Sequence, residues 1–466
     1  MTYNGKRGTL ILAIGAAALT LALVRFAVHV ATFDYAARMF DLGIYRDGGL
    51  IARHAYHFRS GRATPLYDWV SPGGGNPFTY PPFAAGIFAL LSYLPLGVLQ
   101  WAMTLASIAA LGASVWLALT GAGLPRGRTA AGVALAVTAV ALWTQPVQSN
   151  LSLGQVNVLL MAAIIADLRP AAAGRKRAGL LTGIAAGIKL TPLVFIPYLL
   201  VTRRFRQAGV AAGAFAATVA VAFAPLPGAS AMYWGGGLFA RANGSPSANM
   251  AFYFASAWNQ SLRGVLSRLL LHAQLATGPW LLAAALTALA GLLAAAWLHA
   301  DGYPMLGVLA CALTGLLISP VSWLHHWVWV APWLAALTAL AIQARGAATR
   351  TWMAWAAAAG LVALAFADVP RLPLLTFGGH GLDPVTDVPM KHPLTWQGID
   401  LILGNCYVLA GLAGVTALFG WGVVRAFRPA GPVRPVPPVR PVQPLQPVRV
   451  TTLPAGSPYR EDLPEL

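Results

Sequence analysis

Residues 178–202 read AGLLTGIAAGIKLTPLVFIPYLLVT, an apolar stretch with a cluster of basic residues on each side. Basic residues at 175–177 precede it, and three arginines within 203–206 follow it. Loops rich in lysine and arginine mark the cytoplasmic face of membrane proteins, so both ends of the stretch are expected on that face. A single straight helix of about 25 residues would rise about 37 Å and carry one cluster across the membrane.

We therefore predict that the chain turns back inside this stretch, at Lys189-Leu-Thr-Pro192. Proline lacks a backbone N–H, and its ring clashes with the preceding helical turn, which disfavours continuing the helix. Irregular backbone at membrane depth has to be buried in protein or line a cavity. Lys189 is accordingly a candidate partner for a phosphate group. The alternative is a lysine whose ammonium merely extends to the membrane interface.

The composition of the whole chain is typical of a membrane protein. Of its 466 residues, 58% are hydrophobic and 9% are charged, and the mean hydropathy is +0.66. A soluble domain carries about 25% charged residues. Apolar runs long enough to cross about 30 Å of hydrocarbon recur, and none alternates as the strands of a membrane β-barrel do. We expect an all-α polytopic membrane protein with about 11–13 transmembrane helices.

The net charge of +18 does not indicate nucleic-acid binding, because the basic residues lie in short loops beside apolar runs. By the same rule both termini are expected in the cytoplasm. The first helix, near 9–31, then leads outward to a long extracytoplasmic loop at 32–80. Cys311 and Cys406 lie in or beside apolar segments, so no disulfide framework is expected.

Residues 82–120 have to cross an odd number of times if the basic loops at 125–128 and 169–177 share one face. We expect one shallow helix near 82–95 and one full span, and the alternative places the loop at Arg126 outside. Further outer loops are expected at 146–155, 228–278, 319–327 and 368–397. The transmembrane domain is predicted to cover 1–428. The tail at 429–466, rich in proline, valine and arginine, is predicted to be disordered and cytoplasmic.

A polar segment between two apolar runs holds distinctive candidates, Ser319-Pro-Val-Ser-Trp-Leu-His-His-Trp327. Polar groups kept at membrane depth are typically functional. His325 and His326 are candidates for binding a phosphate or orienting a carboxylate, and the alternative is a structural role at the interface. A metal site would need further ligands with suitable geometry, and the sequence shows no such cluster, so no metal is expected.

Acidic residues are scarce, and the first outer loop holds four of the 13: Asp34, Asp41, Asp47 and Asp68. A carboxylate there is a candidate general base for a hydroxyl group. The alternative for Asp41 is a helix N-cap. Two amide-containing motifs add polar candidates, Gly154-Gln-Val-Asn157 at the start of a span and Asn259-Gln-Ser-Leu-Arg263 in an outer loop. Buried amides need hydrogen-bond partners.

Six motifs occur in an order that resembles a known family: Asp41-Leu-x-x-Tyr45, Phe78-Thr-Tyr-Pro-Pro82, Gly154-Gln-Val-Asn157, Gly187-Ile-Lys-Leu-Thr-Pro192, Asn259-Gln-Ser-Leu-Arg263 and Ser319-Pro-Val-Ser-Trp-x-His-His-Trp327. They resemble the actinobacterial polyprenol-phosphate-mannose-dependent mannosyltransferases, GT-C-fold enzymes of glycosyltransferase family 87. The likeness is to the α-(1→2)-mannosyltransferases of phosphatidylinositol mannoside synthesis. It covers residues 33–330 and does not extend to the tail.

The resemblance implies an outward-facing site, a polyprenyl monophosphate mannose donor and a glycolipid or lipoglycan acceptor. It implies inverting transfer without a metal ion or another cofactor, with Asp41 as the general base and Asp47 as the second candidate. The expected partners of the donor phosphate are Lys189, Arg263, His325 and His326. The expected sugar- or acceptor-binding residues are Tyr45, Tyr80, Gln155, Asn157, Asn259, Gln260 and Trp323.

Two other functions remain open at this point. Some members of the same family transfer arabinofuranose from a polyprenyl phosphate, and the segments at 319–327 and 259–263 favour mannose over that sugar. A transporter or flippase of lipid-linked sugars would also have broken helices. The chain shows no internal repeat, and its polar loops gather on one face, which favours the enzyme.

Overall fold

The computed structural model describes residues 3–32, 39–57, 65–68, 77–170, 174–236, 254–270, 276–344, 353, 355–360, 362, 366 and 398–426. The chain forms two units, Met1–Arg425 and Ala426–Leu466, and Ala426 is the one described residue of the second. The predicted tail at 429–466 lies outside the described residues. Within the described ranges the chain is helical, as predicted, and it has no β-strand beyond a single bridge between Asn259 and Trp323.

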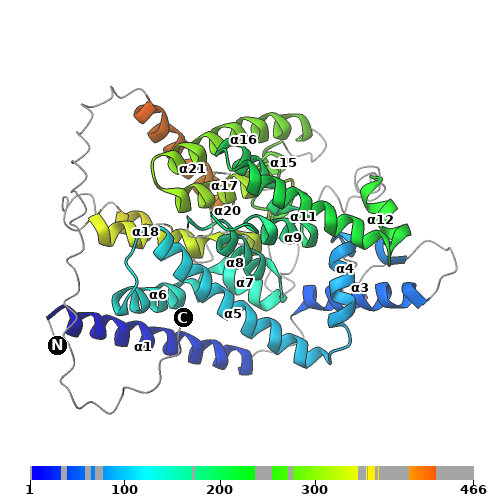
Figure 1. Ribbon diagram of the computed structural model, residues 1–466, viewed down its shortest axis with the longest axis horizontal. Coiled ribbons are helices and arrows are strands. Elements are labelled where there is room, and N and C mark those ends of the chain that lie inside the picture. Colours follow the sequence, from blue (N-terminus) through cyan, green and yellow to red (C-terminus); the bar gives the residue numbers. More distant parts are fainter. Residues whose placement is uncertain are drawn as a thin grey trace, which may run out of the picture. The chain divides into compact units, whose positions relative to one another are not determined.

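Figure 1 shows the arrangement of the helices in the first unit. Their bounds are α1 (Tyr3–Thr32), α3 (Phe40–His57), α4 (Pro82–Leu91), α5 (Leu96–Gly121), α6 (Arg128–Leu142), α7 (Gln145–Leu153), α8 (Asn157–Leu168), α9 (Leu180–Ile188), α10 (Phe195–Val201), α11 (Phe205–Phe223), α12 (Pro227–Trp234), α15 (Leu262–Leu269), α16 (Thr277–Ala300), α17 (Pro304–Ile318), α18 (Val330–Ala344), α20 (Ile399–Gly404) and α21 (Cys406–Ala426). Three short 3₁₀ helices join them: η1 (Pro65–Tyr67), η3 (Thr191–Val194) and η4 (Leu324–Trp329).

Helices α1 and α6 run side by side in the same direction (Figure 1). Gly8 lies beside Thr129 at their N-terminal ends. Near their other ends, the guanidinium of Arg25 lies 4.1 Å from the ring centre of Trp143. The loop at Arg126 is therefore on the same side as the basic N-terminus. This agrees with the predicted parity and contradicts the alternative that placed the two on opposite faces.

The segment 82–120 forms one short helix and one long helix, as predicted. α4 has 10 residues, and α5 has 26, which is long enough to cross a membrane. α4 packs closely on α3. A Cβ atom on Gly49 of α3 would lie 2.3 Å from the carbonyl oxygen of Phe88 in α4, which leaves no room for a side chain there. This contact holds α3 against α4, near the start of the membrane domain.

The predicted outer loop at 146–155 is wrong in its secondary structure. Helix α6 ends at Leu142, and the chain bends by 70° into α7. α7 begins with Pro146 in its first turn, where the missing N–H is harmless, and it buries Val147, Asn150 and Leu151. In a sequence, a proline that starts a helix is easily taken for a loop residue, which explains why a loop was predicted here. The predicted loops at 228–278 and 319–327 likewise contain α12, α15 and η4.

Helices α8 and α9 form a hairpin whose closed end is fixed by Asp167. Its carboxylate accepts hydrogen bonds from the backbone N–H of Gly179 at 2.9 Å and from the N–H and hydroxyl of Thr182 at 3.0 and 2.8 Å. A carboxylate at a helix N-terminus satisfies free N–H groups and complements the helix dipole. The open end of the hairpin carries Asn157 and Lys189.

Helix α9 packs on α11 through glycines at every fourth position. Cβ atoms on Gly179, Gly183 and Gly187 would lie 2.3, 2.3 and 2.1 Å from atoms of Gln207, Ala211 and Thr218 of α11, respectively. Small residues at such spacing let helix backbones approach closely in membranes. Because residue numbers increase in the same direction along both helices at these contacts, α9 and α11 run parallel.

The predicted turn at Lys189-Leu-Thr-Pro192 is confirmed. α9 ends at Ile188, Lys189 is extended with φ −147°, and η3 and α10 bring the chain back before α11 starts. Arg206 of α11 donates from Nη2 to the carbonyl oxygen of Arg175 at 2.5 Å, so the two flanking basic clusters lie together. Lys189 is therefore at the opposite end of α9 from both clusters.

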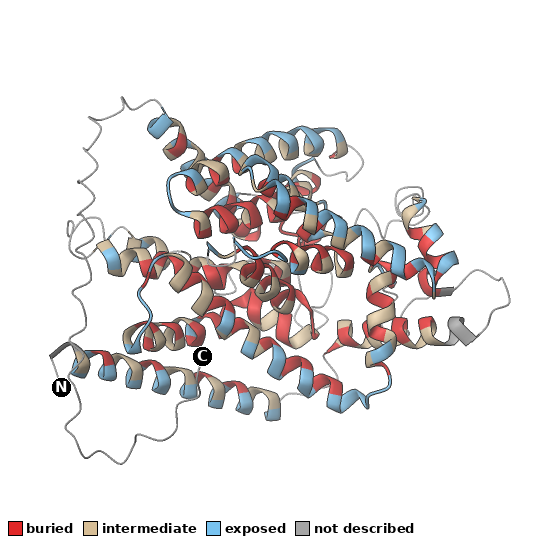
Figure 2. Ribbon diagram, in the orientation of Figure 1, coloured by how far each residue is buried: buried red, intermediate tan, exposed pale blue. Residues whose placement is uncertain are grey.

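Six helices in the described ranges are long and apolar enough to cross a membrane, or seven if the bent pair α6–α7 counts as one. They are Gly5–Thr32, Leu96–Gly121, Phe205–Phe223, Thr277–Ala300, Leu324–Ala344 and Cys406–Ala426. Only 17% and 22% of the residues in the apolar windows of the first and fourth are buried, against 56% for Leu324–Ala344. Exposed residues line α1 and α16 accordingly (Figure 2). The multi-pass architecture is confirmed, and the count of crossings stays a prediction.

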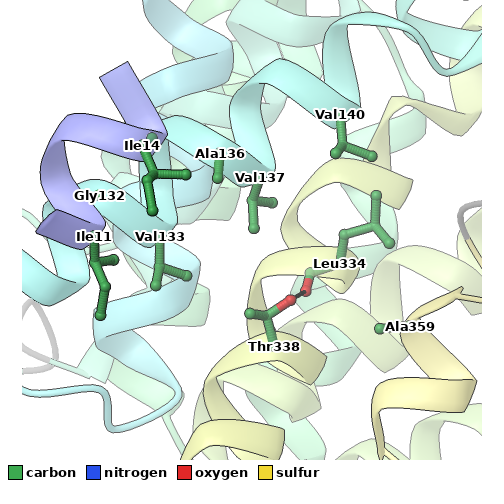
Figure 3. Close-up of a pocket in the computed structure, with 11 residues that line it drawn as sticks. Ile11, Ile14, Gly132, Val133, Ala136, Val137, Val140, Leu334, Thr338 and Ala359 are labelled. Atoms are coloured by element: carbon green, nitrogen blue, oxygen red, sulfur yellow. Dashed lines mark hydrogen bonds between the residues drawn. The ribbon is translucent and has the colours of Figure 1, made fainter. Parts of the chain in front are cut away.

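An apolar pocket of about 420 Å³ opens between α1, α6 and α18 (Figure 3). It borders the contact between Gly15 and Gly132, where a Cβ on Gly15 would lie 2.1 Å from the carbonyl oxygen of Gly132. The hydroxyl of Thr338 faces this pocket but already donates to the carbonyl of Leu334 at 2.7 Å. The pocket therefore offers little to a sugar or a phosphate, and the polar site lies elsewhere.

The packing of α9 on α11 gives a first testable prediction. Gly183→Ala adds a methyl group 2.3 Å from a backbone oxygen, so we expect it to lower stability by about 1–3 kcal/mol. Gly209→Ala, on α11 with nothing within 4 Å, is the matched control and should leave stability unchanged or raise it slightly. Thermal unfolding of both variants in detergent measures the difference. Equal melting temperatures would contradict the close approach.

Candidate active site

Helix α3 presents Asp41 and Tyr45 four residues apart, on one face. Asp41 is in the first turn, where a negative charge is favoured by the helix dipole, and it is half-buried. Tyr45 is 2% exposed, and its ring stacks on Phe88 of α4 with centroids 4.6 Å apart. The helix thus holds a carboxylate and a phenol in fixed positions.

Tyr80 stands at the entrance to α4, next to the prolines that start that helix. Its carbonyl oxygen accepts a hydrogen bond from the hydroxyl of Tyr67 at 2.9 Å. Phe78 is fully buried, and its ring would be 2.4 Å from a Cβ on Gly48 of α3. Close packing on α3 therefore directs the hydroxyl of Tyr80 toward that of Tyr45, at 2.6 Å.

Gln155 and Asn157 follow a left-handed turn at the end of α7. Gly154 has φ +68°, and a Cβ there would lie 2.7 Å from the Cβ of Leu42 on α3. Only glycine suits this position, because a side chain would be strained and would push α3 away. Asn150 clamps the turn by donating from Nδ2 to the carbonyl of Gln155 at 3.0 Å.

Lys189 ends α9 and reaches three acceptors. Its ammonium lies 2.8 Å from Oδ1 of Asn157, 3.1 Å from Nε2 of His326 and 3.3 Å from the hydroxyl of Tyr80. An ammonium has three donors, so all three can be used at once. These contacts join the start of α8, the end of α9, the start of α4 and η4 at one point.

Gln155 connects this point to Asp41. Its Nε2 donates to Oδ2 of Asp41 at 2.6 Å, and its Oε1 accepts from the hydroxyls of Tyr45 and Tyr80 at 2.7 and 3.1 Å. Nδ2 of Asn157 lies 3.3 Å from the same oxygen. A carboxylate and an ammonium are thus joined through uncharged side chains. We call Asp41, Tyr45, Tyr80, Gln155, Asn157, Lys189 and His326 the polar cluster.

Burial raises the pKa of the Asp41 carboxyl above its ordinary value. The hydrogen bond from Gln155 and the positive charge of Lys189 lower this pKa by smaller amounts. Asp41 lies on α3, outside the helices long enough to cross a membrane. A carboxylate with a raised pKa is a better proton acceptor than an ordinary one, which suits a general base.

The two histidines sit on η4, beside Lys189. His326 contacts the ammonium directly, and its ring lies 4.8 Å from that of His325, centre to centre. The carbonyl of His325 accepts from Nδ2 of Asn157 at 3.1 Å. Nε2 of His325 is buried and has no hydrogen-bond partner among the described residues. A further polar group would satisfy this nitrogen.

The comparisons with known proteins identify the family. Residues 78–320 match the model of glycosyltransferase family 87. The chain belongs to glycosyltransferase family 87. The matched range includes Tyr80, the two amides of 155–157, and Lys189. The family predicted from the six motifs is confirmed, and with it the glycosyltransferase class.

Curated relatives of this family 87 chain cover most of its length. A polyprenol-phosphate-mannose-dependent alpha-(1-2)-phosphatidylinositol pentamannoside mannosyltransferase of Mycolicibacterium smegmatis is 36% identical over 75% of this chain and 80% of its own. The protein of the same name from Mycobacterium tuberculosis is 34% identical over 81% of each chain. A Mycobacterium tuberculosis alpha-(1-2)-phosphatidylinositol mannoside mannosyltransferase is 32% identical over 73% of this chain and 79% of its own. No solved structure matches the chain.

The motif at 259–263 of the glycosyltransferase lies in a separate arrangement. Asn259 is fully buried, and its amide bonds to the carbonyls of Phe254 and Pro320 and to the N–H of Ser322, at 3.1, 3.2 and 2.9 Å. Gln260 is fully buried too and donates to the carbonyls of Ala257 and Gly404. The bonds from Asn259 to Pro320 and Ser322 hold the backbone of 319–323 in place, with Trp323 bridged to Asn259.

Buried Arg268 completes this arrangement and was not singled out from the sequence. Its guanidinium donates to the carbonyls of Ala255, Ser256 and Asn259 and to Oδ1 of Asn405. It therefore ties α15 to the loop before it and to Asn405, which lies between α20 and α21. A lone arginine five residues after a polar motif has no distinctive signal in sequence. The glycines at 179, 183 and 187 did have one, a four-residue spacing.

Two predicted site residues face other neighbours. The guanidinium of Arg263 lies 3.5 Å from the ring centre of Phe254 and 5.1 Å from that of Trp280, at the start of α16. Asp47 is six residues beyond Asp41 on α3, so helical geometry turns it about 120° away. Neither joins the polar cluster, and their predicted roles remain untested.

The surroundings of Asn259 generate a prediction. Asn259→Ala removes hydrogen bonds to three buried backbone groups, so we expect a loss of stability of about 1–3 kcal/mol. Thermal unfolding measures it, and the Michaelis constants should change little in the protein that remains folded. An unchanged melting temperature together with a raised KM for the acceptor would instead make Asn259 a sugar-binding residue, as first predicted.

Proposed function

We propose that this glycosyltransferase transfers mannose from polyprenyl monophosphate mannose to a phosphatidylinositol mannoside, forming an α-(1→2) linkage. The observation that carries the proposal is the polar cluster, which joins a candidate base, Asp41, to a candidate phosphate partner, Lys189. The printed names of the mycobacterial relatives supply the donor, the acceptor and the linkage. Their sequences cover at least 73% of this chain, which supports carrying the substrates over.

The reaction divides between the two ends of the cluster. The acceptor oxygen forms a bond to the anomeric carbon of mannose, while the bond from that carbon to the phosphate oxygen breaks. Asp41 takes the proton of the acceptor hydroxyl as the new bond forms, and the transition state has oxocarbenium character. A single displacement inverts a β-linked donor to an α-linked product.

The departing phosphate carries the negative charge that develops in the transition state. Lys189 lies where this charge can be stabilised, with His326 in contact and the unpartnered Nε2 of His325 nearby. These groups supply the positive charge and donors that another enzyme would obtain from a metal ion, so the transfer is proposed to need none. The polyprenyl chain would extend into the surrounding hydrocarbon.

The site is proposed to face the extracytoplasmic side. Lys189 is at the opposite end of α9 from the basic clusters at 175–177 and 203–206, which the positive-inside rule assigns to the cytoplasm. The loop at 32–80, which holds Asp41, is then outside, and both termini are cytoplasmic. Lipid-linked donor and lipid acceptor would meet at that surface.

The role of Asp41 can be tested against Asp47 on the same helix. Asp41→Asn keeps the shape and the contact with Gln155 but removes the proton acceptor, so we expect transfer to fall by about 10²–10⁴-fold. Asp47→Asn is the matched control and should remain near native activity. The assay follows radiolabelled mannose from polyprenyl phosphate mannose to a phosphatidylinositol mannoside in lipid vesicles.

Three other outcomes of this assay would change either the assignment of the base or the proposed function. Full activity of Asp41→Asn with loss in Asp47→Asn would move the base to Asp47. Transfer only from polyprenyl phosphate arabinose would make the chain an arabinofuranosyltransferase. Movement of lipid-linked mannose across the bilayer without its consumption would make it a flippase.

The raised pKa of Asp41 predicts the pH dependence of transfer. A general base works when deprotonated, so kcat/KM should rise with pH through the pKa of Asp41 and level off above it. Because burial raises this pKa, the acidic limb should lie above about pH 4, the ordinary value for aspartate. Initial rates at low acceptor concentration across the acidic range measure it. An acidic limb at or below the ordinary value would contradict the role of Asp41 as the base.

A further inference from the structure

The side-chain oxygen of Gln155 has no capacity left for a substrate. An amide oxygen has two lone pairs, and Oε1 already has the hydroxyls of Tyr45 and Tyr80 and the Nδ2 of Asn157 within 3.3 Å. The residue is 5% exposed. A sugar hydroxyl could reach this oxygen only by displacing an internal donor. The prediction from the sequence that Gln155 binds sugar therefore has an alternative, in which its side chain serves internal hydrogen bonds instead.

The orientation of the amide is determined by its neighbours. A flipped amide would place its oxygen 2.6 Å from the carboxylate oxygen of Asp41, two acceptors facing each other. It would also turn its NH₂ group toward the donor Nδ2 of Asn157. In the observed orientation the amide nitrogen faces the carboxylate and the amide oxygen faces donors, so Gln155 presents an N–H to Asp41.

The hydrogen bonds also share one direction. Lys189 donates to Tyr80 and Asn157, these donate toward Oε1 of Gln155, and Gln155 donates to Asp41. There are two routes, one through Tyr80 and one through Asn157. Along both, each hydrogen bond is donated in the direction from the Lys189 ammonium toward the Asp41 carboxylate. Hydrogen bonds aligned in this way polarise and strengthen one another.

The backbone of Gln155 is held as firmly as its side chain. Its N–H donates to the carbonyl of Asn150 at 2.9 Å, and its carbonyl accepts from the side chain of Asn150 at 3.0 Å. Gly154 and Leu42 fix the turn against α3, the helix that carries Asp41. Gln155 is therefore held by direct contacts against the helix that carries Asp41.

We propose that Gln155 is the positioning residue of this site: by binding Oδ2 of Asp41 it directs Oδ1 to the acceptor hydroxyl, and it contacts no sugar itself. Among the described residues none is hydrogen-bonded to Oδ1, and the proposal assigns this oxygen to the acceptor hydroxyl. This inference rests on the proposed function, in which Asp41 is the general base. It concerns a residue that acts through the base, so its loss should slow the chemical step rather than weaken substrate binding.

The test uses Gln155→Met, which keeps the length of the side chain and removes its hydrogen bonds. We expect kcat to fall by about 10- to 100-fold, as for a misplaced catalytic group, with the KM of donor and acceptor changed less than about 3-fold. Gln148→Met in neighbouring α7 is the matched control, since Gln148 bonds to the carbonyl of Leu142 and lies outside the polar cluster. It should retain native kinetics.

The pH profile separates positioning from a merely structural role. The titratable groups around Asp41 are Tyr45 on its own helix, Tyr80, Lys189 and, beyond it, His326. Gln155→Met removes the direct bond to the carboxylate and leaves these groups in place. The acidic limb of kcat/KM should then move to higher pH, because that bond favours the charged carboxylate. A lower melting temperature with an unmoved limb would overturn the proposal.

A double-mutant cycle with Asp41→Asn completes the test. If Gln155 acts through Asp41, Gln155→Met should cause little further loss of transfer in the Asp41→Asn background. Additive losses, or a raised KM with unchanged kcat, would overturn the proposal and return Gln155 to the sugar-binding residues. An active Asp41→Asn would instead overturn the assignment of Asp41 as the general base, on which this inference rests, whereas a native chain that transfers no mannose would overturn the proposed function, so the failures are distinguishable.

Discussion

A half-buried lysine ammonium needs acceptors to replace the water that it loses, and Lys189 imposes this requirement on the whole arrangement. Its three partners come from segments far apart in the chain: Tyr80 before α4, Asn157 at the start of α8, and His326 on η4. An unpaired charge at such a place costs several kcal/mol, so these segments are held together wherever the lysine is charged. The convergence that satisfies Lys189 also brings Gln155 onto Asp41.

The position of Lys189 is in turn set by backbone packing. Glycines at 179, 183 and 187 let α9 lie directly on α11, and Asp167 closes the other end of the hairpin. Because α9 has nine residues, it places Lys189 part-way along the neighbouring α11 and ends there. Short helices thus make a polar site inside an apolar bundle, and they meet where irregular backbone is covered by protein.

A second group of polar residues supports the site without entering it. Asn259, Gln260 and Arg268 satisfy the backbone carbonyls and N–H groups of two loops that meet beside η4. This shapes the segment at 319–323 that leads into the histidines. Polar motifs of similar appearance therefore differ in role. Asn259, Gln260 and Arg268 form hydrogen bonds to backbone groups, whereas the amides of the polar cluster form hydrogen bonds to the charged side chains of Asp41 and Lys189.

Several features followed from the sequence because each depends on local chemistry. Apolar run length gave the membrane class, basic clusters with Pro192 gave the turn at Lys189, and six ordered motifs gave the family. The tertiary structure decided which polar residues meet. Helix geometry alone places Asp41 and Tyr45 on one face, but it cannot show that Gln155, 114 residues away, binds Asp41. Nor could it show that Asn259 faces backbone while Asn157 faces Lys189, since an amide's partner depends on which helices pack together.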